Sequence, residues 1–365
     1  MYPGLRTLCL LLMLTCTRQA LCQGSLLLVM QKDLYGYANS RGKMVIKPRF
    51  QLAQPFSEGL AGVSVCTDRG WRWGFIDESG EFVIKPRFHD SKSFREGLAG
   101  VQLGDKWGFI NKKGEMTIDP KLDDEYGVDF EFREGLSAVI VNEKYGFIDP
   151  SGKLVIPATF DHADNFSEGL AYVMIDDKAG FIDRTGTVVI PLKYELASRF
   201  SEGLGLVNIG RTLGKNTDDP GYRAGKWYYI GVSGKIAFPT GYDFADEFSE
   251  GLAAVRVNGK IGYIDKKGAY VVKPRFDNGE SFSESLASVE VKDRWGYIDR
   301  TGQFILPPQF QEASSFGNGV AGVRNVTPNY VHYDYIDKNG KHIASYGKIK
   351  RGVWIKAANC PPIGS

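Results

Sequence analysis

The residues best suited to chemistry in this 365-residue sequence are four histidines, a run of carboxylates and one glycine-rich stretch. His89, His162, His332 and His342 include no pair at the three- or four-residue spacing of a helical metal site, and no cysteine lies near them. We interpret His89 and His162 as solvated loop residues. The sequence therefore predicts no metal site and no cofactor.

Acidic side chains gather between residues 123 and 134, where paired carboxylates could cleave a glycosidic bond or hold Ca²⁺. They are Asp123, Asp124, Glu125, Asp129, Glu131 and Glu134. A solvated acidic loop explains them without a buried partner, and we prefer that interpretation. We predict no catalytic residue, and a hydrolase is the weakest of the functional alternatives.

The stretch "GRTLGK" at residues 210–215 is superficially similar to a phosphate-binding loop. It has three residues between its glycines where such a loop needs four. Asn216 also follows it, where serine or threonine is required. We reject a phosphate site here.

Composition indicates a folded chain of many short strands. The sequence is 43% hydrophobic and 13% aromatic, and its 44 glycines and 16 prolines are spread along it. With 45 basic and 43 acidic residues, the formal net charge is +2, and the signs alternate along the chain. This balance gives no reason to expect a nucleic-acid partner.

The first 22 residues have the features of a secretory signal. An apolar run, "TLCLLLMLTC" at residues 7–16, follows Arg6, and "ALC" at residues 20–22 places small residues before a cut ahead of Gln23. We expect a secreted, periplasmic or envelope location. A short buried strand is the alternative. No apolar run of 18 residues follows, so we expect no transmembrane segment in the mature chain.

Two cysteines, Cys66 and Cys360, remain after that cut. In an exported chain they form either one disulfide or two separate thiols. The sequence alone leaves both alternatives open.

The chain repeats itself. The glycine of "WGFID" at Gly74 recurs at steps of 34, 38 and, once, 48 residues, with Tyr228 and Asp334 in two degenerate copies. A second stretch, "FSEGL" or "FREGL", follows the same period. About nine units result, and one active site would not need nine copies.

Each unit can be interpreted physically. "GFID" is a short strand that enters a turn such as Asp77-Glu78-Ser79-Gly80, where aspartate can cap the turn and glycine accepts a left-handed conformation. "EFVIKP" is a second strand, and because its proline lacks a ladder donor, the strand either ends there or lies at a sheet edge. "LAAVRV" is the third strand. The repeated tryptophans, phenylalanines and glycines are interpreted as packing residues, the glutamate of "SEGL" as a turn contact and the "KPR" tips as solvated edges.

Stretches such as "KWGFINKKGEMTIDP" and "FSEGLAAVRVNGKIGYIDKKG" resemble the WG repeat family, also described as KWG repeats, over about residues 32–343. The resemblance implies a β-rich, often exported protein with no established catalytic residues and, loosely, a binding or scaffold role. Ala179 and Ile261 stand where the pattern has tryptophan, and Trp227 is followed by Tyr228. Packing positions tolerate such departures better than catalytic positions.

The predicted fold is all-β: a tandem array of about nine three-stranded β-meander repeats, propeller-like or an open β-solenoid. A ring is slightly favoured, although nine units exceed the usual four to eight blades. The predicted organisation is a signal peptide at residues 1–22, the array at residues 23–343 and a basic tail at residues 344–365.

Partner contacts are expected where the repeat is irregular, because insertions lie in exposed loops. Residues 211–224, 66–73 and 325–333 carry the insertions. From them the sequence predicts Trp71, Arg211, Tyr222 and Arg223 as partner-binding residues. The expected function is non-catalytic binding of a protein or scaffolding, and a carbohydrate- or cell-wall-binding module with exposed aromatics is the alternative.

Overall fold

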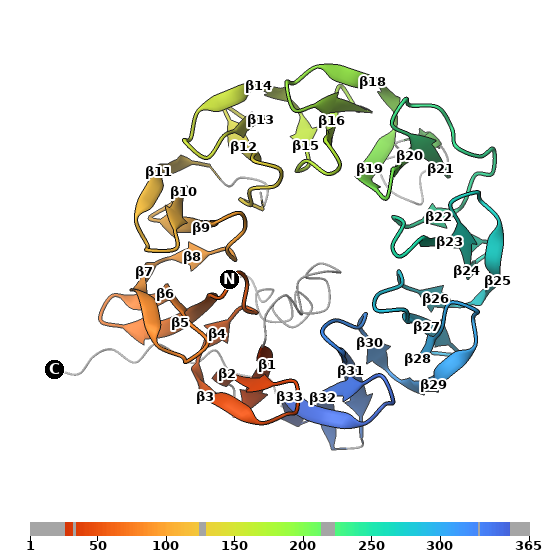
Figure 1. Ribbon diagram of the computed structural model, residues 1–365. Helices are drawn as coiled ribbons and strands as arrows, with labels where there is room; N and C mark the ends of the chain where they lie inside the picture. Colours follow the sequence, from red (N-terminus) through yellow and green to blue (C-terminus); the bar gives the residue numbers. More distant parts are fainter. Residues whose placement is uncertain (1–25, 32–33, 124–128, 213–222, 328, 351–365) are drawn as a thin grey trace.

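The computed structural model describes residues 26–31, 34–123, 129–212, 223–327 and 329–350. Nine small antiparallel sheets form a closed ring, a nine-bladed β-propeller (Figure 1). The all-β prediction is confirmed, and the ring is the correct one of the two predicted architectures. Every described element is a strand, so this part of the chain offers no helix that could cross a membrane.

The blades follow one another in chain order around the ring. Blade 1 contains β1 (Leu26–Gln31), β2 (Leu34–Asn39) and β3 (Met44–Phe50). Blade 2 contains β4 (Leu52–Ala53), β5 (Ala61–Thr67), β6 (Gly70–Ile76) and β7 (Phe82–Phe88). Blade 3 contains β8 (Asp90–Ser91), β9 (Leu98–Leu103), β10 (Lys106–Asn111) and β11 (Met116–Leu122). Blades 4 to 6 contain β12 (Ser137–Val141), β13 (Lys144–Ile148), β14 (Leu154–Phe160); β15 (His162–Ala163), β16 (Leu170–Ile175), β17 (Lys178–Asp183), β18 (Val188–Tyr194); and β19 (Leu196–Ser201), β20 (Leu204–Thr212), β21 (Arg223–Gly231).

Blades 7 to 9 complete the ring. They contain β22 (Phe244–Ala245), β23 (Leu252–Val257), β24 (Lys260–Asp265), β25 (Tyr270–Phe276); β26 (Asn278–Gly279), β27 (Ala287–Val291), β28 (Arg294–Ile298), β29 (Phe304–Phe310); and β30 (Glu312–Ala313), β31 (Val320–Val326), β32 (Tyr330–Asp337), β33 (His342–Lys350). The last strand continues beyond residue 343, where the sequence predicts that the array ends.

A complete blade has four strands, one more than predicted. The first is a two-residue strand on the inner side of the ring, such as β8 or β22, and the fourth, such as β7 or β25, lies on the circumference (Figure 1). The sequence does not reveal the inner strand because two residues are too few for a period-two pattern. The proline-containing strand is the outer edge of its sheet, which is one of the two predicted alternatives. The other alternative is wrong, because β7 and β25 continue past Pro86 and Pro274.

Two kinds of turn shape each blade. In "SEGL" the backbone N–H and C=O groups of Ser57 and Leu60 bond to each other, and Glu58 and Gly59 both have positive φ, which defines a tight two-residue hairpin. In the Asp-x-x-Gly turn, Asp77 Oδ1 accepts bonds from the N–H groups of Ser79 and Glu81. The predicted aspartate-capped turn is therefore confirmed.

The repeated glycine allows the outer strand to cross closely over the third strand. At Gly262 an added Cβ would lie 2.6 Å from both the Val272 carbonyl oxygen and the Pro274 nitrogen. The pairing of β24 with β25 shifts register at this point. In blade 6, Tyr228 replaces the glycine, and only two isolated bridges, Trp227 to Tyr242 and Ile230 to Ile236, remain on that edge.

Aromatic pairs join neighbouring blades. The aromatic residue after the repeated glycine packs against the phenylalanine of the next blade's "FSEGL", as Tyr263 does against Phe282 with ring centroids 4.9 Å apart. Eight such pairs have centroids 4.7–5.0 Å apart: Tyr37–Phe56, Phe75–Phe94, Phe109–Phe132, Phe147–Phe166, Phe181–Phe200, Tyr229–Phe248, Tyr263–Phe282 and Tyr297–Phe316. The core therefore lies between blades.

The ring closes by packing blade 9 against blade 1. A cluster of Leu27, Val29 and Ala38 from blade 1 and Val320 and Tyr335 from blade 9 forms this junction. Among the described residues the two blades belong to separate sheets and share no strand. In this part of the chain, closure rests on side-chain contacts between the two sheets.

Candidate binding surfaces on the ring

The repeated glutamates form a structural chain around one face. Each accepts a hydrogen bond from backbone N–H groups in the next blade's "SEGL" or equivalent turn; Glu168, for example, accepts from Glu202 at 2.6 Å and from Gly203 at 2.8 Å. The seven are Glu58, Glu96, Glu134, Glu168, Glu202, Glu250 and Glu284. The prediction of a turn contact is confirmed, although the contact is with the neighbouring turn.

Basic residues complete these contacts. Lys112 lies 3.1 Å from the Glu58 carboxylate and also donates to the Glu58 carbonyl oxygen. Burial acts to raise the pKa of Glu58, but the bonds from Lys112 and the Gly97 N–H outweigh it and lower that pKa. Glu58 is thus an ionised bridge between two blades.

The opposite face has a second set of bridges. Asp277 pairs with Lys260 of one blade and accepts a bond of 2.8 Å from the N–H of Lys292 in the next. His89 occupies the same position in its repeat and accepts from the Gly104 N–H at 3.0 Å. His162 is exposed, with its ring 5.2 Å from that of Tyr145. Neither histidine contributes to a metal cluster among the described residues.

The "KPR" arginines also join blades. Arg87 lies over the ring of Phe88 at 4.9 Å and donates to the carbonyl oxygen of Gly114 in the next blade at 2.5 Å. Arg49 and Arg275 make the equivalent contacts. These tips are structural as well as solvated.

The inner rim of the ring carries residues that change from blade to blade. They precede the "FSEGL" phenylalanine, in an otherwise constant part of the repeat. The residue immediately before it is Pro55, Ser93, Glu131, Asn165, Arg199, Glu247, Ser281 or Ser315. Variation of this kind within a constant frame is the sequence signal that would have identified the rim.

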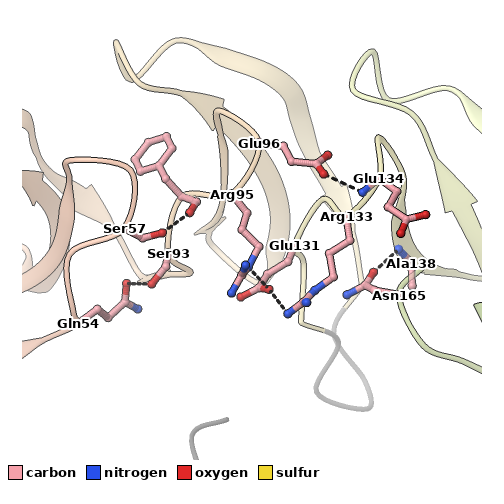
Figure 2. A network of polar contacts seen from close by, with 11 residues as sticks. Gln54, Ser57, Ser93, Arg95, Glu96, Glu131, Arg133, Glu134, Ala138 and Asn165 are labelled. Carbon is pink, nitrogen blue, oxygen red and sulfur yellow. Dashed lines mark hydrogen bonds and ion pairs between the residues drawn. The ribbon is translucent and has the colours of Figure 1, made fainter. Parts of the chain in front are cut away.

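In blades 3 to 7 these positions and the charged residues beside them, including the arginines that directly follow Phe94 and Phe132, form what we call the rim charge cluster. Its members are Lys92, Arg95, Asp129, Glu131, Arg133, Asp164, Arg199 and Glu247. Figure 2 shows Glu131 between two arginines, 2.7 Å from Arg95 Nε and 3.1 Å from Arg133. Arg199 Nε lies 3.1 Å from Glu247, whose carboxylate also accepts from the Ser198 hydroxyl at 2.7 Å.

The cluster is partly desolvated and electrically balanced. Burial and the adjacent Glu131 raise the pKa of Asp129. Burial acts to lower the pKa of Arg199, but Glu247, Asp164 and Asp129 together raise it. The cluster has four basic and four acidic side chains, and the side chain of Arg199 is 38% exposed. Such a surface matches a partner with charges of both signs.

The acidic cluster predicted from the sequence does not converge on one point. Asp123 pairs with Lys106, Glu134 bonds to the Gly169 N–H, and Asp129 and Glu131 belong to the rim. Asp124 and Glu125 lie outside the described residues. The described members have separate roles.

The described residues among the predicted partner-binding set belong to blades 2 and 6. Trp71 is half-buried on β6, and Arg211 is half-buried on β20 and pairs with Ala224 in the ladder. Arg223 begins β21, and Tyr222 lies outside the described residues. Trp71 and Arg211 are four blades apart, so they do not form one site. Both flank turns between the second and third strands, so they share one face.

The predicted disulfide involves one residue inside and one outside the described chain. Cys66 on β5 is disulfide-bonded. Cys360 lies outside the described residues, so the pairing of these two stays a prediction.

The sequence matches the model of the WG containing repeat in eight stretches: residues 35–65, 73–107, 107–145, 145–178, 180–212, 229–260, 261–295 and 295–325. A search of the curated proteins gives no match.

Solved structures give distant fold matches. Kluyveromyces lactis Hsv2p matches with a TM-score of 0.41 at 10% identity, over 73% of this chain and 99% of that chain. Porphyromonas gingivalis dipeptidyl peptidase 4 matches with a TM-score of 0.46 at 11% identity, over 90% and 59% of the two chains. The dihydro-heme d1 dehydrogenase NirN in complex with DHE matches with a TM-score of 0.45 at 14% identity, over 89% and 73%.

Proposed function

Because this chain belongs to the WG-repeat family, we propose that it is an exported, non-catalytic ring that binds a protein partner across the rim charge cluster. Three sets of repeated charged residues, the glutamates, the aspartates and the "KPR" arginines, bond one blade to the next. Selection for a stable ring accounts for them. Apart from these three repeated sets, the charged residues of the rim differ from blade to blade.

The observation that carries the proposal is the half-buried ion network of Arg95, Glu131 and Arg133 within the charge-balanced rim cluster. A polyanion would favour a surface of one sign, and a metal would favour oxygen ligands without interleaved arginines. Mixed charges on a rigid frame suit the polar surface of a folded protein or an extended peptide.

The carbohydrate-binding alternative has less support. It needs aromatic side chains exposed at the repeat period. Trp107 is buried and stacks on Phe130, with centroids 4.9 Å apart, and each other tryptophan in the described ranges is half-buried. Tryptophan fluorescence that resists solvent quenching would agree with this placement.

A capture experiment with matched variants tests the proposal. Residues 23–365 are purified and exposed to the native extracellular or periplasmic fraction, and bound material is identified by mass spectrometry. The rim variant R133E/R199E reverses two charges, and K153E/K267E reverses two on exposed turns. We expect one protein partner to be retained by the wild type and by the turn variant and lost with the rim variant.

Other outcomes separate the alternatives. A partner that survives the rim variant but is lost when residues 211–224 are deleted would move the site to the blade 6 insertion. Retention of polysaccharide alone would replace the protein-binding proposal. N-terminal sequencing of the exported protein tests processing independently, and a start at Gln23 is the expected result.

A further inference from the structure

Large apolar side chains are exposed on the outer circumference of three successive blades. They lie in, or just after, the turn that follows the third strand of blades 6, 7 and 8. We call this group the outer arc, and its members, each between 41% and 56% exposed, are Val232, Ile236, Tyr270, Val271, Phe304 and Ile305. Exposed apolar side chains that gather on one surface indicate an interaction site.

Contacts between the blades join the outer arc into one surface. Phe276, at the end of β25, packs against Phe304 of β29 with ring centroids 6.0 Å apart, and Figure 1 places these two strands next to each other on the circumference. The turn of blade 7 also meets blade 6, because an added Cβ at Gly268 would lie 2.8 Å from the ring of Phe238. The members of the arc therefore lie on adjoining blades.

The charges along the outer arc are mostly basic. Residues 231–238, 265–276 and 299–310, which form the turns and outer segments of blades 6 to 8, contain six basic and two acidic residues. The acids are Asp265 and Asp299, and each caps its own turn by accepting hydrogen bonds from backbone N–H groups. The arc therefore combines apolar exposure with a basic excess.

Other parts of the circumference have only one of these two properties. Blades 4 and 5 expose similar apolar side chains, but residues 149–160 and 183–194 contain three basic and two acidic residues. In blade 1, residues 39–50 contain four basic residues and no acid, but Val45 is their one large apolar side chain that is exposed. Blade 2 exposes Phe82 and Val83 among three acidic and two basic residues at 77–88.

Two lysines of the outer arc have charges that the ring does not use. Lys235 and Lys273 are exposed and make no ion pair within the described part of the chain. By contrast, Lys266 lies 3.0 Å from Glu202 and is held in the ring of glutamates. Lys273 is two residues after Val271 on β25, so the two side chains point to the same side of the strand.

We propose that the outer arc docks against the surface of a lipid bilayer that carries anionic headgroups. The lysines attract such a surface, and the exposed apolar side chains enter the boundary between headgroups and acyl chains. Tyr270 suits this boundary because its ring is apolar and its hydroxyl is polar. The rim charge cluster lies on the inner side of the ring, so this proposal is independent of the protein-binding proposal.

The outer strands argue against a protein strand or a second copy of the chain as the occupant. Pro274 in β25, and Pro307 and Pro308 in β29, lack the N–H donors that an added strand would need along these edges. A second copy would also bring the same basic excess against the arc, and like charges repel. A lipid surface needs no backbone pairing and supplies negative charge.

Vesicle flotation tests the proposal. Purified residues 23–365 are mixed with vesicles of phosphatidylcholine, alone or with phosphatidylglycerol, and the bound fraction is measured. We expect binding to the mixed vesicles that weakens with added salt, and little binding to phosphatidylcholine alone. The variants F304S/I305S and K235E/K273E should each weaken binding about fivefold or more, because they remove apolar insertion or reverse two attracting charges.

Matched variants keep the test specific to the arc. L154S/V155S removes the equivalent apolar pair from blade 4, and K85E/K153E makes the same change of net charge on blades 2 and 4. Both should bind the mixed vesicles like the wild type. Thermal unfolding identifies any variant that fails to fold, and a second measurement does not depend on loss of binding: brominated phosphatidylglycerol should quench the added fluorescence of Tyr270→Trp more than that of Leu154→Trp.

Three results would overturn the proposal. The first is a wild type that does not bind the mixed vesicles, and the second is an equal loss of binding from F304S/I305S and L154S/V155S. The third is binding that is lost with K235E/K273E, unchanged in F304S/I305S and competed by dextran sulfate, because the arc would then be a site for polyanions in general.

Discussion

At the residue scale, several repeated residues have a role in backbone geometry. The glycines permit an unusual or crowded backbone, and the glutamates accept hydrogen bonds that offset a strained one. The seven "SEGL" or equivalent glutamates have φ between 50° and 55°, a region that costs a residue with a side chain about 1 kcal/mol or more. Blade 9 has Asn318, a residue better suited to this conformation, and no "FSEGL" precedes blade 1 in the sequence. A glutamate with positive φ therefore occurs in those blades whose neighbour has an equivalent turn, because the backbone N–H groups of that turn donate to its carboxylate.

Removing the charge of one glutamate should weaken one junction. Glu202 accepts from the Gly251 N–H at 3.0 Å and pairs with Lys266 at 3.0 Å. We expect Glu202→Gln to lower the free energy of unfolding by about 1 kcal/mol, because a bond to a charged acceptor becomes a neutral one. Chemical denaturation measures the change. Glu81→Gln, at an exposed position, is the control, and an equal loss there would contradict the assignment.

The close-approach glycines should not tolerate even a methyl group. Gly262→Ala would place Cβ against the outer-strand backbone, and we expect a loss of about 2 kcal/mol or more. Gly231 has ordinary φ and nothing within 4 Å of an added Cβ, so Gly231→Ala should be nearly neutral. Thermal unfolding of the pair tests this, and similar Tm values would show that the outer strand can move aside.

At the scale of elements, each blade is a small sheet that is stabilised mainly by its neighbours. A sheet of three or four short strands buries little alone, and the aromatic pairs, the glutamates and the Asp–Lys bridges all cross between blades. Charged bridges on both faces make this assembly sensitive to acid.

The pH dependence has a defined sign. The bonds from Lys260 and the Lys292 N–H lower the pKa of Asp277 below its ordinary value, and the same direction holds for Asp161 and Asp243. Because the folded-state pKa is the lower one, this stabilisation is present above the unfolded pKa of about 4 and is lost as the pH falls through the folded-state value. We expect Tm to fall steeply below about pH 4.

Asp277→Asn isolates one contribution to that loss. The variant should be less stable than the wild type at neutral pH, and the difference should shrink as the pH is lowered. Tm measured from pH 7 downwards gives both curves. Parallel curves would show that Asp277 does not contribute through its ionisation.

At the scale of the whole molecule, the junction between blades 9 and 1 decides whether the array is a ring. Leu27 and Val29 meet Val320 and Tyr335 there, and the turn at Gly42 touches the backbone of Ile343. No covalent connection or shared strand reinforces this junction within the described residues. It should therefore be the first place where the ring opens.

Alanine substitutions of two glycines test whether this junction closes the ring. Both substitutions place alanine at a positive φ, so they carry a similar backbone strain. Gly42 and Gly59 both have positive φ, but an added Cβ would clash with the Ile343 carbonyl oxygen at Gly42 and meets nothing within 4 Å at Gly59. We expect Gly42→Ala to lower Tm more than Gly59→Ala and to speed hydrogen exchange in β1 and β33. Equal effects would mean that this contact is not needed for closure.

Much of this molecule follows from sequence alone. The number of units, the all-β class, the Asp-x-x-Gly turns, the edge position of the proline strand and the packing role of Trp107 are local or periodic properties, and repetition makes them visible. The sequence did not reveal the two-residue inner strands or the hydrogen bonds between each glutamate and the next blade. It also did not reveal that the members of the rim charge cluster come together on the inner rim. Those depend on contacts between residues in different repeats, and on the small rotation between blades that sums to a closed circle. Period and composition encode the unit, whereas only the stacked tertiary structure decides which units meet, whether the ends join and which side chains remain available to a partner.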